Sequence, residues 1–191
     1  RGGKVLRAVT VPQAPLPVEV RMAGGAVFVS DGTQTGFAVV KLNEDLKILG
    51  AVGRGRRGEL LIHPDGKMGY CLTQPANELL VFDTATMKEI ATFHLAEPDS
   101  DPLDLPDTAK HRMVFASKGA LLLVASGHGG HMAGIDTAKN ELLGEVSIDP
   151  RRLGSAVNEL KLSGDGRNVL VASGGVVGSV AIADLRFQRI R

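Results

Sequence analysis

Four stretches of the sequence repeat one order of events, and this repeat limits the fold more than any other feature. Each stretch runs through a short strand, a turn containing Gly, an apolar strand, a polar loop, another apolar strand, a polar turn and a last strand. The second strands end at Ser30, Thr73, Ser126 and Ser173, so the spacings are 43, 53 and 47 residues. Four short strands in a unit of about 40 to 50 residues are typical of a β-propeller blade.

The repeat therefore predicts an all-β fold, a β-propeller of four-stranded antiparallel blades with about four repeats present. The intervals between the predicted strands are too short for the crossover helices of a doubly wound α/β fold. The apolar runs are short, rich in Val, Leu and Ile, and bounded by Gly, Asn and Asp, so they show no helical period. A β-sandwich would not explain four aligned copies.

The repeat also divides residues 1–191, taken as a single propeller domain or segment. The blades are predicted over residues 12–53, 54–95, 96–149 and 150–191. Residues 1–11 match the outermost strand of a preceding or closing blade, and the last blade is truncated where its own outermost strand would begin. Two interpretations stay open: either the N-terminal strand closes a four-bladed ring, or the chain is a segment of a larger propeller. In the second, missing blades or another chain complete the ring and cover its open edges.

The second repeat, "IHPDGKMGYCLTQPANELLVFDTATMKEIATFHL", resembles the repeats of the YVTN and lactonase-like β-propellers. This resemblance extends along the whole chain and implies the propeller fold. Because it is a resemblance to bacterial propellers, it also implies a periplasmic or secreted setting. Catalytic lactonase-like propellers carry an Arg-His pair before the turn and Asn-Glu after the aromatic strand. This chain has Gly58-Glu59 and Thr73-Gln74 at those places, although His63 is retained, so the catalytic motif is not matched.

Ligand-binding residues are predicted on one face of the propeller. The loops between second and third strands share a face with the links between blades, and in propellers this is usually the binding face. The candidate ligand-binding residues there are Arg54, Arg56, Arg57, Arg151, Arg152, Gln74 and Asn77. Guanidinium groups would suit carboxylate or phosphate groups of a partner or small anion. The alternative is that these arginines serve solubility or pair with acidic residues of the chain.

A divalent cation site is a second hypothesis for the same face. The insertion at residues 96–110 carries five carboxylates and would lie beside the loop "GHGG". The candidate metal ligands are His128, His131, Asp99, Asp101 and Asp104. Oxygen ligands suit calcium, and a mixture of His and carboxylate suits zinc or manganese. A solvated acidic loop beside a polar turn is the alternative, and there is no Cys-x-x-Cys-His haem motif.

Charge and composition argue against two classes of function, nucleic-acid binding and membrane spanning. The formal net charge of +1 argues against nucleic-acid binding driven by bulk charge. No apolar run approaches the roughly 20 residues of a transmembrane segment. The favoured hypothesis is a non-catalytic binding or scaffold module that docks a protein, peptide or saccharide on its loop face. The alternative is a propeller domain of a metal- or cofactor-dependent redox or hydrolytic enzyme, lactonase-like in type.

Overall fold

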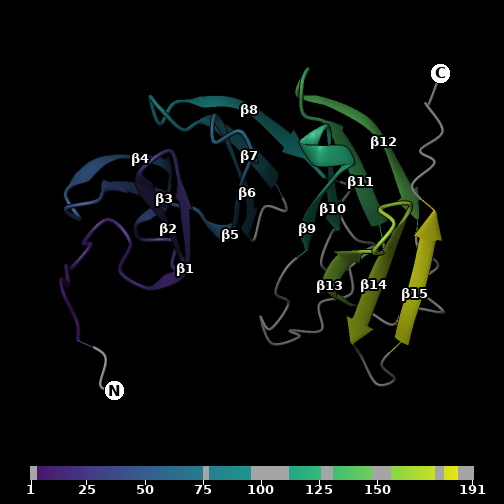
Figure 1. Cartoon of the computed structure of the whole chain (residues 1–191), viewed down its shortest axis with the longest axis horizontal. Helices are drawn as coiled ribbons and strands as arrows, with labels where there is room; N and C mark the ends of the chain where they lie inside the picture. Colours follow the sequence, from purple (N-terminus) through teal and green to yellow (C-terminus); the bar gives the residue numbers. More distant parts are fainter. Residues whose placement is uncertain are drawn as a thin grey trace. The chain divides into compact units, whose positions relative to one another are not determined.

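The computed structural model describes residues 4–74, 78–95, 112–125, 131–147, 156–174 and 179–184 (Figure 1). These residues form fifteen β-strands and one short 3-10 turn. In this part of the chain, no helix is long and apolar enough to cross a membrane. The predicted all-β fold is confirmed.

The strands form four sheets, here called blades 1 to 4. Blade 1 contains β1 (Pro17–Ala23), β2 (Ala26–Asp31), β3 (Phe37–Asn43) and β4 (Ile48–Arg54). Blade 2 contains β5 (Arg57–Ile62), β6 (Met68–Gln74), β7 (Glu78–Asp83) and β8 (Glu89–His94). Blade 3 contains β9 (Met113–Ala116), the 3-10 turn η1 (Ser117–Gly119), β10 (Leu121–Ala125), β11 (His131–Asp136) and β12 (Glu141–Ser147). Blade 4 contains β13 (Ala156–Leu162), β14 (Asn168–Gly174) and β15 (Ser179–Asp184).

Within every blade the strands follow chain order, and consecutive strands pair in an antiparallel manner. This is the meander that the repeat predicted. The fourth strand expected for blade 4 would lie in residues 185–191, outside the described residues. Residues 4–16 form no strand, so the pairing of residues 1–11 as an outer strand of another blade stays a prediction.

Contacts along the chain divide it into two compact units. Unit 1 comprises Arg1–Pro75 and Leu80–Thr92, and unit 2 comprises Ala76–Leu79 and Phe93–Arg191. Blade 1 and most of blade 2 therefore belong to unit 1, and blades 3 and 4 to unit 2. The prediction of a single domain is not tested by this division.

Short turns with defined chemistry fix the hairpins. Gly24 and Gly25 join β1 to β2 with φ angles of 54° and 72°, which glycine adopts without steric cost. The longer turn between β5 and β6 is closed by His63, whose N–H donates to the Met68 carbonyl at 2.8 Å. In that turn the Asp65 carboxylate accepts from the Lys67 N–H at 2.8 Å. Each hairpin thus satisfies its backbone locally.

Unit 1 has its main core between blade 1 and blade 2. Phe28 and Val39 of blade 1 belong to one buried cluster with Leu60, Cys71 and Phe82 of blade 2. Cys71, which lies within an apolar run of the sequence, is fully buried in this core.

Specific contacts reinforce this core. A Cβ at Gly69 would stand 2.0 Å from the Phe82 ring, so only glycine lets the ring pack there. Lys41 of β3 donates to the Thr84 carbonyl at 2.7 Å and lies 5.8 Å from the centre of the Phe28 ring. The hydrogen bond from Lys41 to Thr84 links the two blades, whereas the cation–π contact lies within blade 1 and the packing of Gly69 on Phe82 lies within blade 2.

The opposite face of blade 1 has a smaller core of its own. Val29, Val40 and Leu42 are buried there, and Ala14 of the N-terminal segment packs on them. In unit 2, blades 3 and 4 share a core of Ala116, Leu123, Ala125, Met132, Val157, Leu160, Val169 and Val171. Met132 is therefore a core residue of unit 2.

Candidate docking surface at the loop end of blades 1 and 2

The β2–β3 loop and the β4–β5 link meet at one end of unit 1. The Gly55 N–H in the link donates to the Gly36 carbonyl in the loop at 2.9 Å. Arg54 ends β4 opposite Phe37, the first residue of β3. In blade 2, Arg57 stands opposite Gln74 in the β5–β6 register. The structure thus brings Arg54, Arg57 and the Gln74 backbone to the same end of the two blades.

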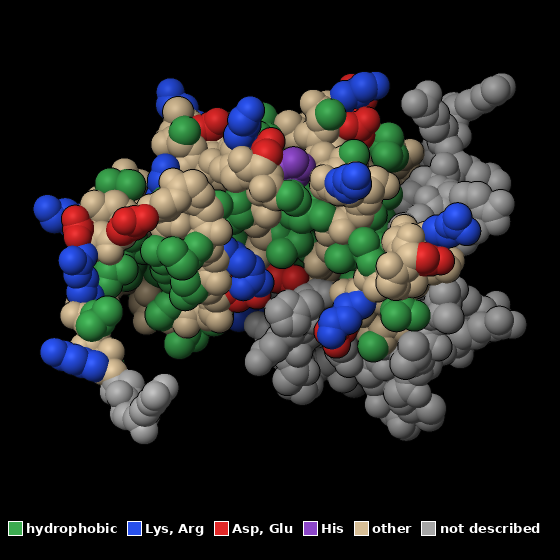
Figure 2. Space-filling model, in the orientation of Figure 1, with side chains coloured by type: hydrophobic (Ala, Val, Ile, Leu, Met, Phe, Trp, Pro, Cys, Tyr) green, Lys and Arg blue, Asp and Glu red, His purple; other side chains and the backbone are tan. Residues whose placement is uncertain are grey.

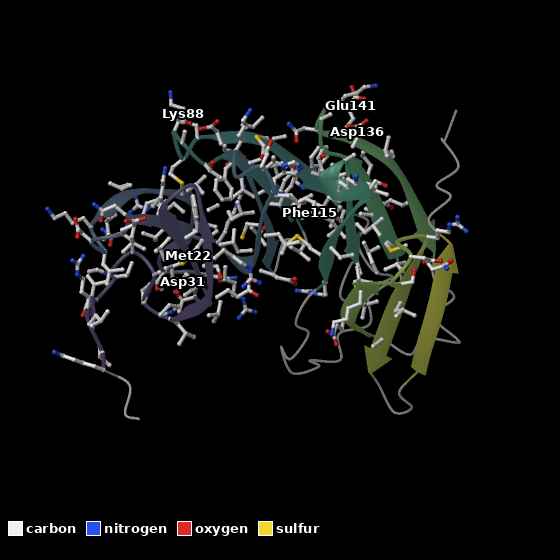
Figure 3. The ribbon with its side chains drawn as sticks, viewed as in Figure 1. Met22, Asp31, Lys88, Phe115, Asp136 and Glu141 are labelled. Atoms are coloured by element: carbon white, nitrogen blue, oxygen red, sulfur yellow. The ribbon has the colours of Figure 1, made fainter. Side chains whose placement is uncertain are left out.

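A buried carboxylate holds the β2–β3 loop in place. Asp31, at the end of β2, is fully buried and accepts from the Leu16 N–H at 2.8 Å and from the Thr33 hydroxyl at 2.5 Å (Figure 3). The Thr33 hydroxyl also lies 3.0 Å from that of Thr35. The loop is further tied to the N-terminal segment, because the Phe37 N–H donates to the Gln13 carbonyl at 2.8 Å. The conformation of the β2–β3 loop is therefore fixed by hydrogen bonds within unit 1.

The three arginines of this end differ in exposure. Arg54 is exposed, whereas Arg56 and Arg57 are half-buried. A guanidinium nitrogen of Arg56 lies 3.7 Å from a carboxylate oxygen of Glu89, and this is an ion pair within unit 1. Of the three, Arg54 is the one best placed to meet a partner.

Carboxylates of the inner strands lie close to this end. Glu19 of β1 accepts from the Leu60 N–H at 2.7 Å, and its other oxygen pairs with Arg21 at 3.1 Å. One blade thereby supplies a hydrogen-bond acceptor to the inner strand of the next. Burial raises the pKa of the Cys71 thiol well above its usual range, and the charges of Glu19 and Glu59 add to this effect. The thiol stays protonated, so it does not serve as a nucleophile.

The Arg-His pair of catalytic lactonase-like propellers does not fit here, because the position of Gly58 has no room for a side chain. A Cβ there would lie 2.2 Å from the Leu72 carbonyl oxygen, so a side chain would clash with the neighbouring strand. His63 follows β5, and its Nδ1 lies 2.7 Å from a carboxylate oxygen of Asp65 within the turn. The Lys67 N–H and then His63 lower the pKa of the Asp65 carboxyl below its ordinary value. His63 thus belongs to a structural turn that directly follows β5.

Several predicted site residues fall outside the described residues. They are Asn77, Arg151, Arg152, Asp99, Asp101, Asp104 and His128. His131 begins β11 with its backbone opposite Ser147, and its side chain is not described. Among the residues that are described, no three His, Cys, Asp or Glu side chains gather to hold a metal ion. The cation site at His128 and His131 stays a prediction.

Sequence reasoning missed the two carboxylates that organise this end. Neither Asp31 nor Glu19 is among the site residues predicted from the sequence. The signal for Asp31 was available, since an acidic residue at the end of an apolar strand must find donors when it is buried. Glu19 gave no comparable signal, because its partner Leu60 lies in another repeat.

Comparison with known proteins gives the fold. No family model matches the chain, and no curated protein matches its sequence. Solved structures do: the hydrazine synthase of Kuenenia stuttgartiensis is 19% identical with a TM-score of 0.70, and the alignment covers 96% of this chain and 50% of that one. The Neurospora crassa Pan2 WD40 domain is 18% identical with a TM-score of 0.59, covering 95% of this chain and 51% of that one. A proposed 6-phosphogluconolactonase of Bacteroides fragilis is 16% identical with a TM-score of 0.61, covering 91% and 54%.

These similarities confirm that the chain has the β-propeller fold, with about four blades. At such identities they show the fold alone, so they do not single out the YVTN and lactonase-like repeat family. The chain spans about half the length of the solved structures that it resembles.

Proposed function

We propose that this chain belongs to a non-catalytic binding module, and that an acidic peptide segment of a protein partner docks on the loop end of blades 1 and 2. The observation that carries the proposal is the meeting of Arg54 and Arg57 with the threonine-bearing β2–β3 loop at one end. An exposed guanidinium group beside hydroxyl groups offers charge-assisted hydrogen bonds to carboxylates.

The rigidity of this end supports the proposal. The buried Asp31 and the hydrogen bond between Gly55 and Gly36 fix the loop and the link together. A preformed surface loses little conformational entropy on binding, so its contacts contribute more of their energy to affinity. The likeness to WD40 propellers is the comparison that supports a protein-binding role. We expect no nucleic-acid partner, because the formal net charge is only +1.

The enzyme hypothesis has less support. It rests on His128, His131 and the acidic insertion, which lie outside the described side chains. The similarity to a proposed lactonase supports the fold, but it identifies no catalytic residue in this chain. A metal- or cofactor-dependent activity therefore stays the alternative.

The proposal is tested by binding of a fluorescein-labelled decaglutamate peptide, measured by anisotropy at low salt. Reversing the charge in Arg54→Glu is expected to raise Kd by about tenfold, which corresponds to about 1.4 kcal/mol. Arg167→Glu is the matched control, since Arg167 is an exposed arginine on the β13–β14 turn. Equal weakening by the two variants would show non-specific charge attraction and contradict the proposal. Binding of a neutral oligosaccharide with no binding of the acidic peptide would also contradict it.

A further inference from the structure

A cavity lies between blades 1 and 2 at their turn end, opposite to the loop end that carries the proposed docking surface. Its volume is about 440 Å³, within the range of roughly 300–1,000 Å³ that is usual for small-molecule sites. Three turns contribute to its walls: the β1–β2 turn at Gly24, the β5–β6 turn at Gly66 and Lys67, and the β7–β8 turn at Thr84 and Ala85. The cavity is therefore formed within unit 1 alone.

Hydrogen bonds connect the walls of this cavity. The Thr84 N–H donates to the Lys67 carbonyl at 2.9 Å, and the Thr84 hydroxyl donates to the Gly66 carbonyl at 2.5 Å, so the two turns of blade 2 are joined. From blade 1, the Lys41 ammonium donates to the Thr84 carbonyl at 2.7 Å and to the Ala85 carbonyl at 3.5 Å. These bonds limit the conformational entropy that a bound molecule would have to remove.

The cavity has an apolar wall and a cationic wall. Ala23, Ala26 and Phe28 form the apolar wall: Ala26 and Phe28 belong to the core that the two blades share, and Ala23 packs against it. Lys41 and Lys67 bring their ammonium groups to the other side chains that line the cavity. A molecule that matches both walls needs a charged head and an apolar body.

The charge of the cavity favours an anionic head. Lys41 is half-buried and donates only to neutral carbonyls, and neither Lys41 nor Lys67 has a carboxylate partner in the described part of the chain. Asp83 also lines the cavity, but its carboxylate already accepts from the Thr86 N–H at 2.7 Å and from the Thr86 hydroxyl at 2.8 Å. Two ammonium groups and one carboxylate leave an excess of one positive charge.

This excess is a local feature of the cavity. On the face that Figure 2 draws, the Lys and Arg side chains of unit 1 lie scattered among Asp and Glu side chains. Lys41 and Lys67 differ from them in lining one cavity beside an apolar wall. A small anion would therefore be attracted to a defined place rather than to a broad basic surface.

We propose that this cavity binds a small organic anion, whose carboxylate or phosphate head contacts the ammonium groups of Lys41 and Lys67 and whose apolar body packs on Ala23, Ala26 and Phe28. A lysine ammonium acts as a compact point charge and accepts either kind of head. Lys41 contributes more than Lys67, because water and salt screen the charge of a half-buried group less than that of an exposed one.

Nuclear magnetic resonance of ¹⁵N-labelled residues 1–191 tests the proposal, with phenyl phosphate as the probe. We expect saturable shifts of the amide signals of Gly24, Gly66 and Ala85, which line the cavity. Benzylammonium has the same ring with the opposite charge and should leave these signals in place. Absence of any shift with phenyl phosphate would overturn the proposal, and so would shifts of the same signals with benzylammonium alone.

Variants of exposed residues test the cationic wall without disturbing the hydrogen bonds of Lys41. Lys67→Gln should raise the Kd of phenyl phosphate about three- to fivefold, the effect of losing one exposed charge contact of up to about 1 kcal/mol. Ala85→Glu should raise it by at least about fivefold, because a carboxylate at the cavity repels the anion. Lys88→Gln is the matched control, since Lys88 is exposed, lies outside the cavity and points outward from unit 1 (Figure 3). Equal weakening by Lys67→Gln and Lys88→Gln would show non-specific charge attraction and contradict the proposal.

Two further probes define the ligand. Phenylacetate carries a carboxylate in place of the phosphate; saturable binding of either anion supports the proposal, and the lower Kd identifies the preferred head. Inorganic phosphate lacks the apolar body, so its Kd should be at least about tenfold higher than that of phenyl phosphate. Equal affinity for inorganic phosphate and phenyl phosphate would contradict the role assigned to the apolar wall.

Discussion

At the scale of single residues, Asp31 connects three segments of unit 1. Its carboxylate receives the Leu16 N–H from the N-terminal segment and the Thr33 hydroxyl from the β2–β3 loop, while its backbone ends β2. The side chain is fully buried, so these donors replace the water that the charge would otherwise keep. A polar residue with this many structural partners fixes the geometry of the proposed docking surface without contacting the partner itself.

Asp31→Ala is expected to lower the free energy of unfolding by about 1–3 kcal/mol, because it leaves the Leu16 N–H without its acceptor. Urea unfolding of residues 1–191 measures the change. Asp45→Ala is the control: Asp45 pairs with Arg7 on the exposed surface, and such a pair contributes about 0–1 kcal/mol. If the two variants lose the same free energy of unfolding, the stabilising role assigned to the Asp31 hydrogen bonds is wrong.

At the scale of elements, aspartates in three turns stabilise their hairpins in the same way, by accepting hydrogen bonds from nearby residues. Asp65 accepts from the Lys67 N–H, and Asp83 accepts from the Thr86 N–H and hydroxyl. Asp165 accepts from the Ser163 hydroxyl and from the Arg167 N–H. In each case hydrogen bonds to the charged form hold the pKa of the carboxyl below its ordinary value of 3.8. The ionised carboxylate therefore favours the folded hairpin over the unfolded chain.

These lowered pKa values predict a loss of stability in acid. The unfolded carboxyls take up protons near their ordinary pKa of 3.8, before the folded ones do, so the unfolded state binds more protons as the pH falls below that value. The stabilisation is complete above about pH 5 and is lost progressively below pH 4. Urea midpoints between pH 6 and pH 2.5 measure this slope. In the triple variant Asp65→Asn, Asp83→Asn, Asp165→Asn the slope should be shallower, and an unchanged slope would assign the acid sensitivity to other groups.

The meander of each blade could be predicted from the sequence, but its register could not. Turn residues and short apolar runs mark the strands, so the order of the strands within each sheet followed. The repeat alignment matched Ser30 with Thr73, and each of these residues lies one position before the end of its strand, β2 at Asp31 and β6 at Gln74. A strand covered on both faces is apolar at nearly every position, and it gives no alternation from which to read register.

The candidate site was predicted only in outline. The sequence placed the β2–β3 loop and the β4–β5 link on one face, and the hydrogen bond between Gly55 and Gly36 joins them. The pairing of Arg56 with Glu89 of β8 could not be foreseen, because it joins residues that are far apart in the sequence. Side-chain contacts between the link and the outer strand of a blade depend on how the folded blade packs, which a repeat pattern does not specify.

At the scale of the whole molecule, the repeat allows equivalent positions of different blades to be compared within one protein. Val20 and Leu60 occupy the same position of successive inner strands, yet one is 57% exposed and the other fully buried. The difference lies in the neighbour, because blade 1 covers Leu60. A substitution at either position therefore reports whether that face of its blade is covered.

Leu60→Ala is expected to lower the free energy of unfolding of residues 1–191 by about 2–5 kcal/mol, because it opens a cavity in the core between blades 1 and 2. Val20→Ala should change it by no more than about 0.5 kcal/mol, because a surface side chain has no packing to lose. Guanidinium unfolding of both variants gives the comparison. A cost at Val20 close to that at Leu60 would mean that the β1 face is already buried in residues 1–191.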